Sequence, residues 1–144
     1  PGIHWEMGQF ADLVICTPDF NIRDDHFIMA PGHVPGDGMY MSLQYQLGAH
    51  RANAVSYLGA EFDSDELVRL GIEVVERDKL LDRAWEMARS IMKSQRTCRR
   101  MTHMLAMRPW KRLVEDDFKL HVTAEMYNKA LTRAYSGFEE IPKY

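Results

Sequence analysis

Histidines and acidic residues that could transfer protons are concentrated near the beginning of the chain. Three of the six histidines fall within the first 33 residues: His4, His26 and His33. The acidic side chains in the same stretch and just after it include Glu6, Asp12, Asp24, Asp25 and Asp37. A carboxylate beside an imidazole fixes the tautomer of the ring and stabilises its protonated form, which prepares it to act as a general base. These residue types therefore predict an acid–base site in the first part of the chain.

Asp37 and its histidine partner are the centre of this prediction. Asp37 stands between Gly36 and Gly38 at the start of an expected helix, where an aspartate either caps the helix N-terminus or orients a histidine. His26 follows two aspartates at the end of an expected strand, and we take it as the preferred partner. His33 lies only four residues before Asp37 and competes for the same role.

His4 and Glu6 alternate about Trp5. On an extended segment, side chains two positions apart point the same way, so both would serve one pocket. The two residues can be combined with His26 as a metal site, but no pair among them has a typical helical ligand spacing. The chain also contains no P-loop, dinucleotide-binding or nucleophile-elbow motif. We therefore expect neither a metal ion nor another cofactor.

The elements expected in the first half of the chain place these residues beside strand ends. An apolar run over residues 10–17 predicts a buried parallel strand, and residues 20–27 predict a second one. A loop rich in glycine and proline follows. Three helices, each ended by a glycine, and a short strand come next: the helices over about 36–47, 50–58 and 64–70, the strand over 72–75. Strand ends, a glycine-rich loop and a helix N-terminus meet where open α/β proteins bind ligands.

The second half of the chain is predicted to be helical. Asp78 is expected to cap a long amphipathic helix over about 80–91. Pro109 is expected to break the following helical stretch, before a last helix over about 110–135. The order strand, strand, helices, strand, helices indicates an α/β fold with a helical tail.

Composition excludes several classes of protein. The chain has 144 residues, 46% of them hydrophobic, and a net charge of −3, which suits one globular domain without general affinity for nucleic acid or an anionic membrane. The basic run Arg96, Arg99 and Arg100 predicts a solvated helix face. Cys16 lies in an apolar run and predicts a core residue. With Cys98 it forms no disulfide or metal framework, so we expect a reducing, cytoplasmic location.

Several short motifs follow one another in a recognisable order: Gly2-Ile3-His4-Trp5-Glu6, Ala11-Asp12-Leu13-Val14-Ile15, Val34-Pro35-Gly36-Asp37-Gly38, Leu47-Gly48 and Leu70-Gly71-Ile72-Glu73-Val74-Val75. The set resembles the crotonase (enoyl-CoA hydratase/isomerase) superfamily. The resemblance implies repeated ββα units followed by C-terminal helices that build trimers or hexamers. The chain would be the C-terminal portion of this fold, with residues 1–76 in the core and 77–144 as a helical trimerisation region. It would then need the N-terminal half of the fold.

At individual positions, the active-site residues differ from those of a typical hydratase in this superfamily. Glu6 matches one of the two hydratase glutamates. Asp24, Asp25 and His26 occupy the region of the second glutamate. The second amide of the oxyanion hole would fall near Ile3, where the family usually has a glycine. These departures point away from a standard CoA-thioester site.

The combination of His4, Glu6, His26 and Asp37 is more similar to the branch of β-diketone hydrolases exemplified by 6-oxocamphor hydrolase. Those enzymes cleave a carbon–carbon bond by a retro-Claisen reaction, without CoA. The resemblance makes His26, oriented by Asp37, the base that activates water. His4 would stabilise and protonate the leaving enolate, and Glu6 would orient His4 or assist proton transfer.

Two other functions stay open. An acyl-CoA hydratase or isomerase of the same fold would act on a CoA thioester with Glu6 and one aspartate of the Asp24–Asp25 pair. A non-catalytic assembly half would only lend its helices to an oligomer. For the preferred function, the expected partners are a small-molecule β-diketone and further copies of the chain, in a trimer or hexamer.

Overall fold

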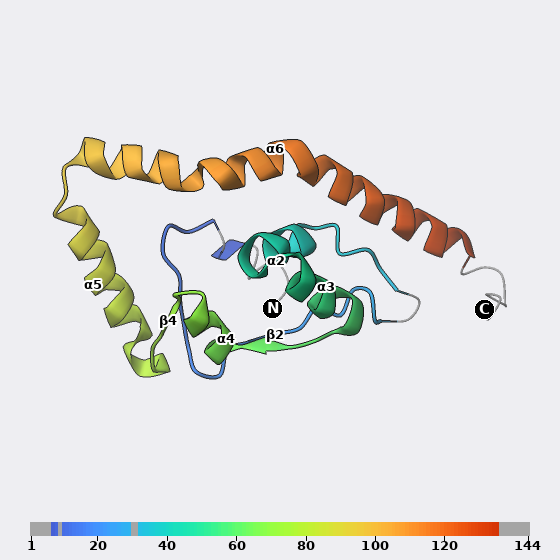
Figure 1. The fold of residues 1–144 in the computed structure, drawn as a ribbon, viewed down its shortest axis with the longest axis horizontal. Helices are drawn as coiled ribbons and strands as arrows, with labels where there is room; N and C mark the ends of the chain where they lie inside the picture. The colour runs from blue at the N-terminus through green and yellow to red at the C-terminus, as the bar shows by residue number, and fades with distance from the viewer. Residues whose placement is uncertain (1–6, 9, 30–31, 136–144) are drawn as a thin grey trace.

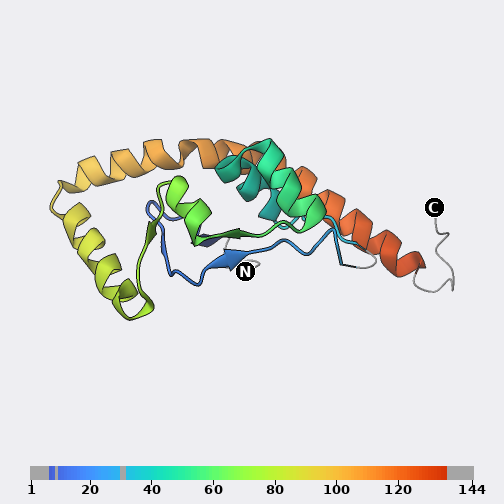
Figure 2. The same cartoon turned by 60° about the horizontal axis from the view of Figure 1, so that its bottom comes forward.

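The computed structural model of the protein describes residues 7–8, 10–29 and 32–135. The elements follow in this order: β1 (Ile15–Cys16), β2 (Asn21–Ile22), α2 (Met39–Leu47), α3 (Ala49–Leu58), β3 (Phe62–Asp63), α4 (Ser64–Arg69), β4 (Glu73–Val74), a 3₁₀ turn (Arg77–Lys79), α5 (Leu80–Met92) and α6 (Arg96–Tyr135). The strands and α2–α4 form a small core below α6, and α5 descends from the beginning of α6 at one end (Figure 1). In a second view α6 still runs alongside α2 and α3 (Figure 2).

The strands of the core form two short pairs. β1 pairs in parallel with β4, with Ile15 opposite Glu73, and β2 pairs antiparallel with β3, with Ile22 opposite Phe62. The predicted parallel arrangement of the first strand is confirmed. Each strand is only two residues long, however, and β3 does not follow from the sequence pattern.

The apolar run over residues 10–17 forms a much shorter strand than predicted. Residues 10–13 make turns and bends instead, and the side chains of Phe10 and Leu13 are exposed. Phe10 packs its ring against Trp110 of α6, with the ring centroids 5.5 Å apart. A strand extends only as far as a neighbouring segment offers hydrogen bonds, and β4 offers them only near Ile15 and Cys16.

The three helices of the core lie close to their predicted bounds. The starts and ends of α3 and α4 agree with prediction to within one residue. α2 begins only at Met39, because Gly38 has a φ of 116° and takes the chain out of the helical conformation. Asp63 caps α4, since its side chain accepts a hydrogen bond of 3.1 Å from the backbone N–H of Glu66.

The main hydrophobic cluster of the described residues comes from positions before 77. Its buried members are Cys16, Ile22, Met39, Leu43, Ala52, Val55, Phe62 and Leu67. The predicted burial of Cys16 is confirmed, and burial raises the pKa of its thiol above the ordinary value. Cys98, by contrast, is exposed.

The predicted cap of α5 is wrong. Asp78 lies inside the 3₁₀ turn, and α5 is preceded by Lys79, which makes no capping hydrogen bond with its side chain. The N–H of Lys79 donates to the carbonyl of Glu76 at 2.9 Å. The chain therefore enters α5 already coiled, so the turn that leads into the helix takes the place of a side-chain cap.

The predicted break at Pro109 is also wrong. α6 continues from Arg96 to Tyr135 with Pro109 inside it, and it changes direction along its length (Figure 1). Proline removes one helical hydrogen bond and favours a kink. The next residue, Trp110, is 5% exposed and packs its ring on Tyr45 at a centroid distance of 4.4 Å, as well as on Phe10. Tertiary packing at this point keeps the helix continuous across the proline.

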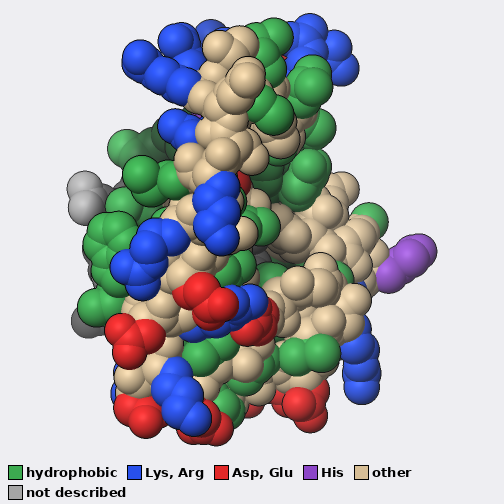
Figure 3. All heavy atoms as spheres, turned by 90° about the vertical axis from the view of Figure 1, so that its left-hand side faces the viewer, with side chains coloured by type: hydrophobic (Ala, Val, Ile, Leu, Met, Phe, Trp, Pro, Cys, Tyr) green, Lys and Arg blue, Asp and Glu red, His purple; other side chains and the backbone are tan. Residues whose placement is uncertain are grey.

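Basic side chains gather where α6 begins. Seen from the side of α5, Lys and Arg side chains project on either side of the top of the molecule, and acidic residues lie lower down among further basic ones (Figure 3). Arg96 and Arg100 are exposed, as expected for a solvated face, whereas Arg99 is half-buried and donates to the carbonyl of Met92 at 2.9 Å. Within the described residues, no helix combines the length and the apolar character needed to cross a membrane.

Candidate active site

The imidazole of His26 lies between two carboxylates. Its Nδ1 is 2.8 Å from Oδ1 of Asp24, and its Nε2 is 3.6 Å from Oδ2 of Asp37. The first distance is that of a hydrogen bond, and the second is longer than one. The structure thus brings His26 and Asp37 side by side, while the hydrogen-bonded partner of the ring is Asp24.

Asp24 lies two residues after β2 and is held in place by three hydrogen bonds. Its side chain is buried, and Oδ1 also accepts the backbone N–H of His26 at 3.0 Å. Oδ2 accepts a hydrogen bond of 3.0 Å from the hydroxyl of Ser56 on α3. Sequence reasoning missed this arrangement. An aspartate two residues before a histidine is a signal for it, because aspartate side chains commonly bond the backbone N–H two residues on.

Asp37 has two contacts, one on each carboxylate oxygen. Oδ1 accepts the backbone N–H of Met39 at 3.2 Å, at the first residue of α2. Oδ2 faces His26. The two roles considered for Asp37 are therefore compatible, since one oxygen supports the start of a helix while the other lies beside a histidine. The side chain is 38% exposed, so solvent reaches the carboxylate.

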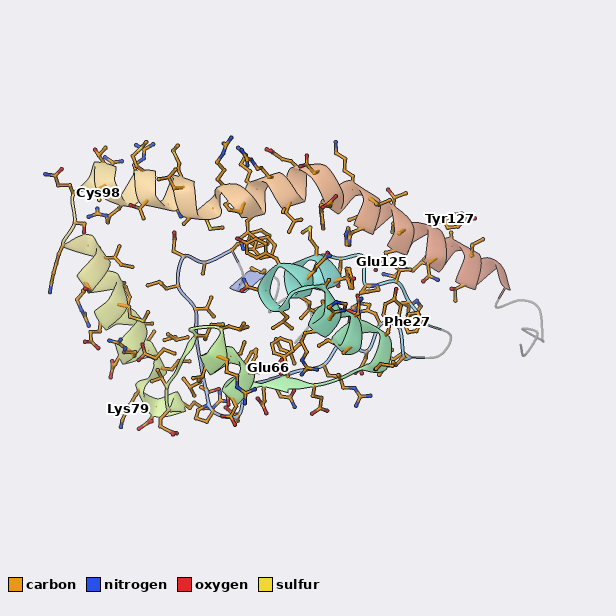
Figure 4. All side chains as sticks on the ribbon, in the orientation of Figure 1. Phe27, Glu66, Lys79, Cys98, Glu125 and Tyr127 are labelled. Atoms are coloured by element: carbon orange, nitrogen blue, oxygen red, sulfur yellow. The ribbon has the colours of Figure 1, made fainter. Side chains whose placement is uncertain are left out.

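Gly36 positions the loop of Asp37 by packing against α6. A Cβ atom at Gly36 would overlap the carbonyl oxygen of His121 and lie 2.5 Å from Cβ of Glu125. Glu125 lies on the side of α6 that faces the core (Figure 4). Nearby, the side-chain oxygen of Asn128 accepts the backbone N–H of Val34 at 3.2 Å. The glycine of this loop is thus required for contact with a helix 85 residues further along the chain, as the pair Gly36 and His121 shows.

Two pockets flank the contact between His26 and Asp37. One, of about 380 Å³, is lined by His26 and His33 together with Arg23, Met39 and Lys129. The other, of about 240 Å³, is lined by Asp37 and Gly38 together with Met7, Trp110 and Phe118. A small molecule in either pocket would meet one member of the pair.

His33 is not placed beside Asp37. Among the described residues, the ion pairs of Asp37 include His26 and not His33. The backbone N–H of His33 donates to the carbonyl of His26 at 2.6 Å, and its buried Nδ1 has no hydrogen-bond partner in the described part of the chain. The geometry therefore places His26, rather than His33, next to the loop aspartate.

Three of the predicted site residues, Ile3, His4 and Glu6, lie outside the described residues. Met7, which follows Glu6 directly in the chain, lines the pocket of Asp37. Over residues 7–8, 10–29 and 32–135, no three histidine, cysteine or acidic side chains gather in a way that could hold a metal ion.

Solved structures similar to this chain include enzymes of more than one activity. The β-diketone hydrolase ABDH from the cyanobacterium Anabaena sp. PCC 7120, bound to (S)-3-oxocyclohexyl acetic acid, is 26% identical, with a TM-score of 0.78 over 85% of this chain and 50% of that protein. An enoyl-CoA hydratase from Mycobacterium tuberculosis H37Rv is 22% identical, with a TM-score of 0.78 over 92% of this chain and 58% of that one. The ECH2 decarboxylase domain of CurF from Lyngbya majuscula is 22% identical, with a TM-score of 0.68 over 85% and 50%.

The chain spans between 50% and 58% of the length of these three structures. A comparison with curated protein sequences finds no match. The family model for enoyl-CoA hydratase/isomerase matches residues 2–137, which is nearly the whole chain. The chain therefore belongs to the enoyl-CoA hydratase/isomerase family and forms a C-terminal portion of the crotonase fold.

Proposed function

We propose that this chain carries the acid–base residues of a hydrolase that cleaves a carbon–carbon bond in a cyclic β-diketone. The observation that carries the proposal is the ring of His26, with Asp24 at one nitrogen and Asp37 near the other. A general base flanked by carboxylates suits proton abstraction from water. The similarity to a β-diketone hydrolase at 26% identity supports the same choice.

In the proposed retro-Claisen reaction, Nε2 of His26 takes a proton from water while the hydroxyl oxygen bonds to one carbonyl carbon of the diketone. The tetrahedral adduct then collapses, and the bond to the carbon between the two carbonyls breaks. Its electron pair passes into an enolate, which takes up a proton to give a keto acid. One water molecule is consumed and no redox partner is needed. A positioned base of this kind contributes roughly 10²- to 10⁴-fold to the rate.

Asp37 is suited to stabilise the charge that this step creates. Its Oδ2 lies 3.6 Å from the nitrogen that would become protonated. A carboxylate at that distance attracts the imidazolium more strongly than the neutral ring. Gly36 lets α6 approach the loop, because it has no side chain. Gly38 provides the positive φ directly before the first residue of α2.

We assign the second half of the reaction to the segment before Met7. His4 would stabilise and protonate the enolate, Glu6 would orient His4 or assist the transfer, and the backbone amide of Ile3 would face the developing oxyanion. Met7, the residue directly after this segment, lines the same pocket as Asp37. The chain therefore enters the described structure at the site. These roles belong to the proposal.

The alternative is an acyl-CoA hydratase or isomerase that uses Glu6 with Asp24 or Asp25. The similarity of the chain to solved enoyl-CoA hydratases supports this alternative. Neither aspartate is placed as a free base, however. Asp24 is buried beneath His26 and Ser56, and Asp25 is 2.6 Å from the guanidinium of Arg23. The described geometry favours the hydrolase.

The helical region bears on the third function, that of a non-catalytic assembly half. It also bears on the oligomeric state. We propose that residues 77–144 form the assembly region of a homotrimer or hexamer, because α5 buries none of its residues and exposes Leu81, Trp85 and Met92. Size-exclusion chromatography with light scattering measures the number of copies. Full turnover of the complete protein in both His26→Ala and Asp37→Asn would match the assembly function, because the acid–base residues would then lie on another polypeptide.

The deciding experiment is a paired assay on the complete protein, meaning this chain together with the N-terminal half of the fold. One arm follows ring opening of a bicyclic β-diketone, and the other follows hydration of a short enoyl-CoA. We expect ring opening, and we expect Asp37→Asn to abolish it, with a loss on the order of 10²-fold or more. Asparagine can still accept the N–H of Met39, so the helix start should survive, which circular dichroism checks.

His33→Ala is the matched control, and its effect should be much smaller. A loss as deep as that of His26→Ala would mean that His33 is the base. Unchanged turnover in Asp37→Asn would remove Asp37 from the mechanism, and hydration without ring opening would establish the acyl-CoA alternative.

A further inference from the structure

We propose that Asp24, held by Ser56, is a positioning residue that keeps His26 in the tautomer with its proton on Nδ1 and so makes Nε2 the atom that takes the proton. This inference rests on the proposed role of His26 as the base. It adds two residues, one of them on a distant helix, to the machinery that prepares the ring.

The surroundings of Asp24 are those of a carboxylate that accepts on both oxygens. The side chain is 1% exposed. Oδ1 receives the backbone N–H of His26 at 3.0 Å and faces Nδ1 at 2.8 Å, while Oδ2 receives the hydroxyl of Ser56 at 3.0 Å. Burying a carboxylate costs free energy unless hydrogen-bond donors surround it. The hydrogen bonds to both oxygens therefore indicate that the fold holds Asp24 in a defined position.

The tautomer follows from the acceptor character of the carboxylate. An ionised aspartate has no proton to donate, so a hydrogen bond of 2.8 Å between Oδ1 and Nδ1 requires the proton to be on Nδ1. A neutral imidazole carries only one ring proton, which leaves the lone pair on Nε2. That nitrogen is the one beside Asp37. Asp24 therefore selects the basic nitrogen, and Asp37 acts on the charge that forms there.

Ser56 supplies the rigidity that this selection needs. It is 3% exposed and lies on α3 directly after Val55, a fully buried member of the core. The following residue, Tyr57, packs edge-on against Phe27, with ring centroids 5.0 Å apart. Phe27, which lies near this end of α3 in Figure 4, is the next residue after His26. Ser56 and Tyr57 of α3 thus contact Asp24 and Phe27, which lie on either side of His26 in the chain.

A purely structural role for Asp24 would be to close the turn through the backbone N–H of His26. The two roles differ in what they predict for the ring. A turn-forming aspartate would leave the tautomer of His26 to its own preference and would leave the pH profile of turnover unchanged when removed. A positioning aspartate controls both.

The test reads the tautomer directly, in the complete protein labelled with ¹⁵N-histidine. Two-bond ¹H–¹⁵N correlation spectra distinguish a ring protonated on Nδ1 from one protonated on Nε2, and the signals that vanish in His26→Ala identify this residue. We expect the Nδ1–H form for neutral His26 in the wild type, and a shift toward the Nε2–H form in Asp24→Ala. Turnover in Asp24→Ala should fall on the order of 10³- to 10⁴-fold, as expected for a base in the wrong tautomer.

Ser56→Ala keeps the test decisive if Asp24→Ala does not fold. Loss of the hydroxyl frees Oδ2 of Asp24, so the variant should show a mixture of tautomers and a fall in turnover on the order of 10- to 10²-fold, with an altered pH profile. Ser56→Thr restores the hydroxyl and should restore both readouts. Ser42→Ala removes another buried hydroxyl, on α2, and should leave the tautomer of His26 unchanged.

Wild-type His26 in the Nε2–H form, or an unchanged tautomer in both Ser56→Ala and Asp24→Ala, would overturn the inference. The spectra need no substrate, which separates this result from the fate of the proposed function. An Nδ1–H ring that depends on Asp24, in a protein that opens no diketone, would disprove the hydrolase alone. Ring opening with a tautomer independent of Asp24 would disprove the positioning role alone.

Discussion

Residues 15–75 and the helical arm that follows them, α5 with α6, bury their apolar side chains very differently. The first region contains every member of the hydrophobic core cluster. α5 has no buried residue, and the buried positions of α6 are Trp110 and Glu125 within its described side chains. Large apolar side chains such as Trp85 and Leu105 are instead more than half exposed on the arm.

The difference shows how the two regions contribute to the site. The first region holds His26 through the hydrogen bonds of Asp24 with the ring and with Ser56. All three residues belong to this region. The arm supports the loop of Asp37 where the middle of α6 meets Gly36, and it lines the two pockets of the site through Lys129, Trp110 and Phe118. Stability is therefore expected to depend on the core, and the geometry of the loop on the arm.

The largest expected effect compares two leucines on helices. Leu43 of α2 is fully buried, whereas Leu105 of α6 is 70% exposed. Leu43→Ala should lower the free energy of unfolding by about 2–5 kcal/mol, because it leaves a cavity in the core. In the monomeric chain, where no other subunit covers the side chain, Leu105→Ala should change it by less than about 0.5 kcal/mol. Urea denaturation measures both, and a clear loss in Leu105→Ala would show that the arm is covered in solution.

An intermediate effect is expected where the arm touches the loop. Gly36→Ala forces a Cβ into the backbone of His121, which cannot move aside as a flexible side chain would, and should cost roughly 1–3 kcal/mol. Gly8→Ala is the control, since nothing lies within 4 Å of a Cβ at that position. Hydrogen exchange should rise along the middle of α6 only in Gly36→Ala. Equal stability of the two variants would mean that α6 does not rest on the loop.

The smallest effect concerns a partly exposed ion pair between α3 and α4. Arg51 donates two hydrogen bonds, of 2.6 and 2.7 Å, to the carboxylate of Glu66, and these bonds lower the pKa of Glu66 below its ordinary value of 4.5. A carboxyl group whose pKa is lowered by folding stabilises the native state above its ordinary pKa. That contribution is lost as the pH falls through the lowered value.

Glu66→Gln should therefore lower the free energy of unfolding at pH 7 by about 0.5–1 kcal/mol. The difference from the wild type should close below pH 4.5, the ordinary pKa of Glu66. On the arm, Glu115 is 3.8 Å from Lys111 on an exposed face, so Glu115→Gln should have no measurable effect at either pH. If the difference in unfolding free energy between Glu66→Gln and the wild type were as large at low pH as at pH 7, the ion pair would not be its cause.

Much of the fold follows from local signals in the sequence. The helices over 49–58 and 64–69 are bounded by glycine, serine and aspartate residues, whose backbone conformations and capping bonds depend on a few neighbours. The parallel strand at Ile15 and the burial of Cys16 follow from an apolar run. Such features can be read from the sequence because each depends on residues that are adjacent in the chain.

Features that depend on distant partners could not be predicted in this way. The lengths of β1 and β2, the continuity of α6 through Pro109 and the overlap of Gly36 with His121 each involve a segment at least 40 residues away. For the candidate site, the sequence by itself indicated the residue types, with His26 and Asp37 in the foreground. Only the tertiary structure decided that Asp24 and Ser56 hold the ring, because the hydroxyl of Ser56 reaches Asp24 from another element, 32 positions along the chain.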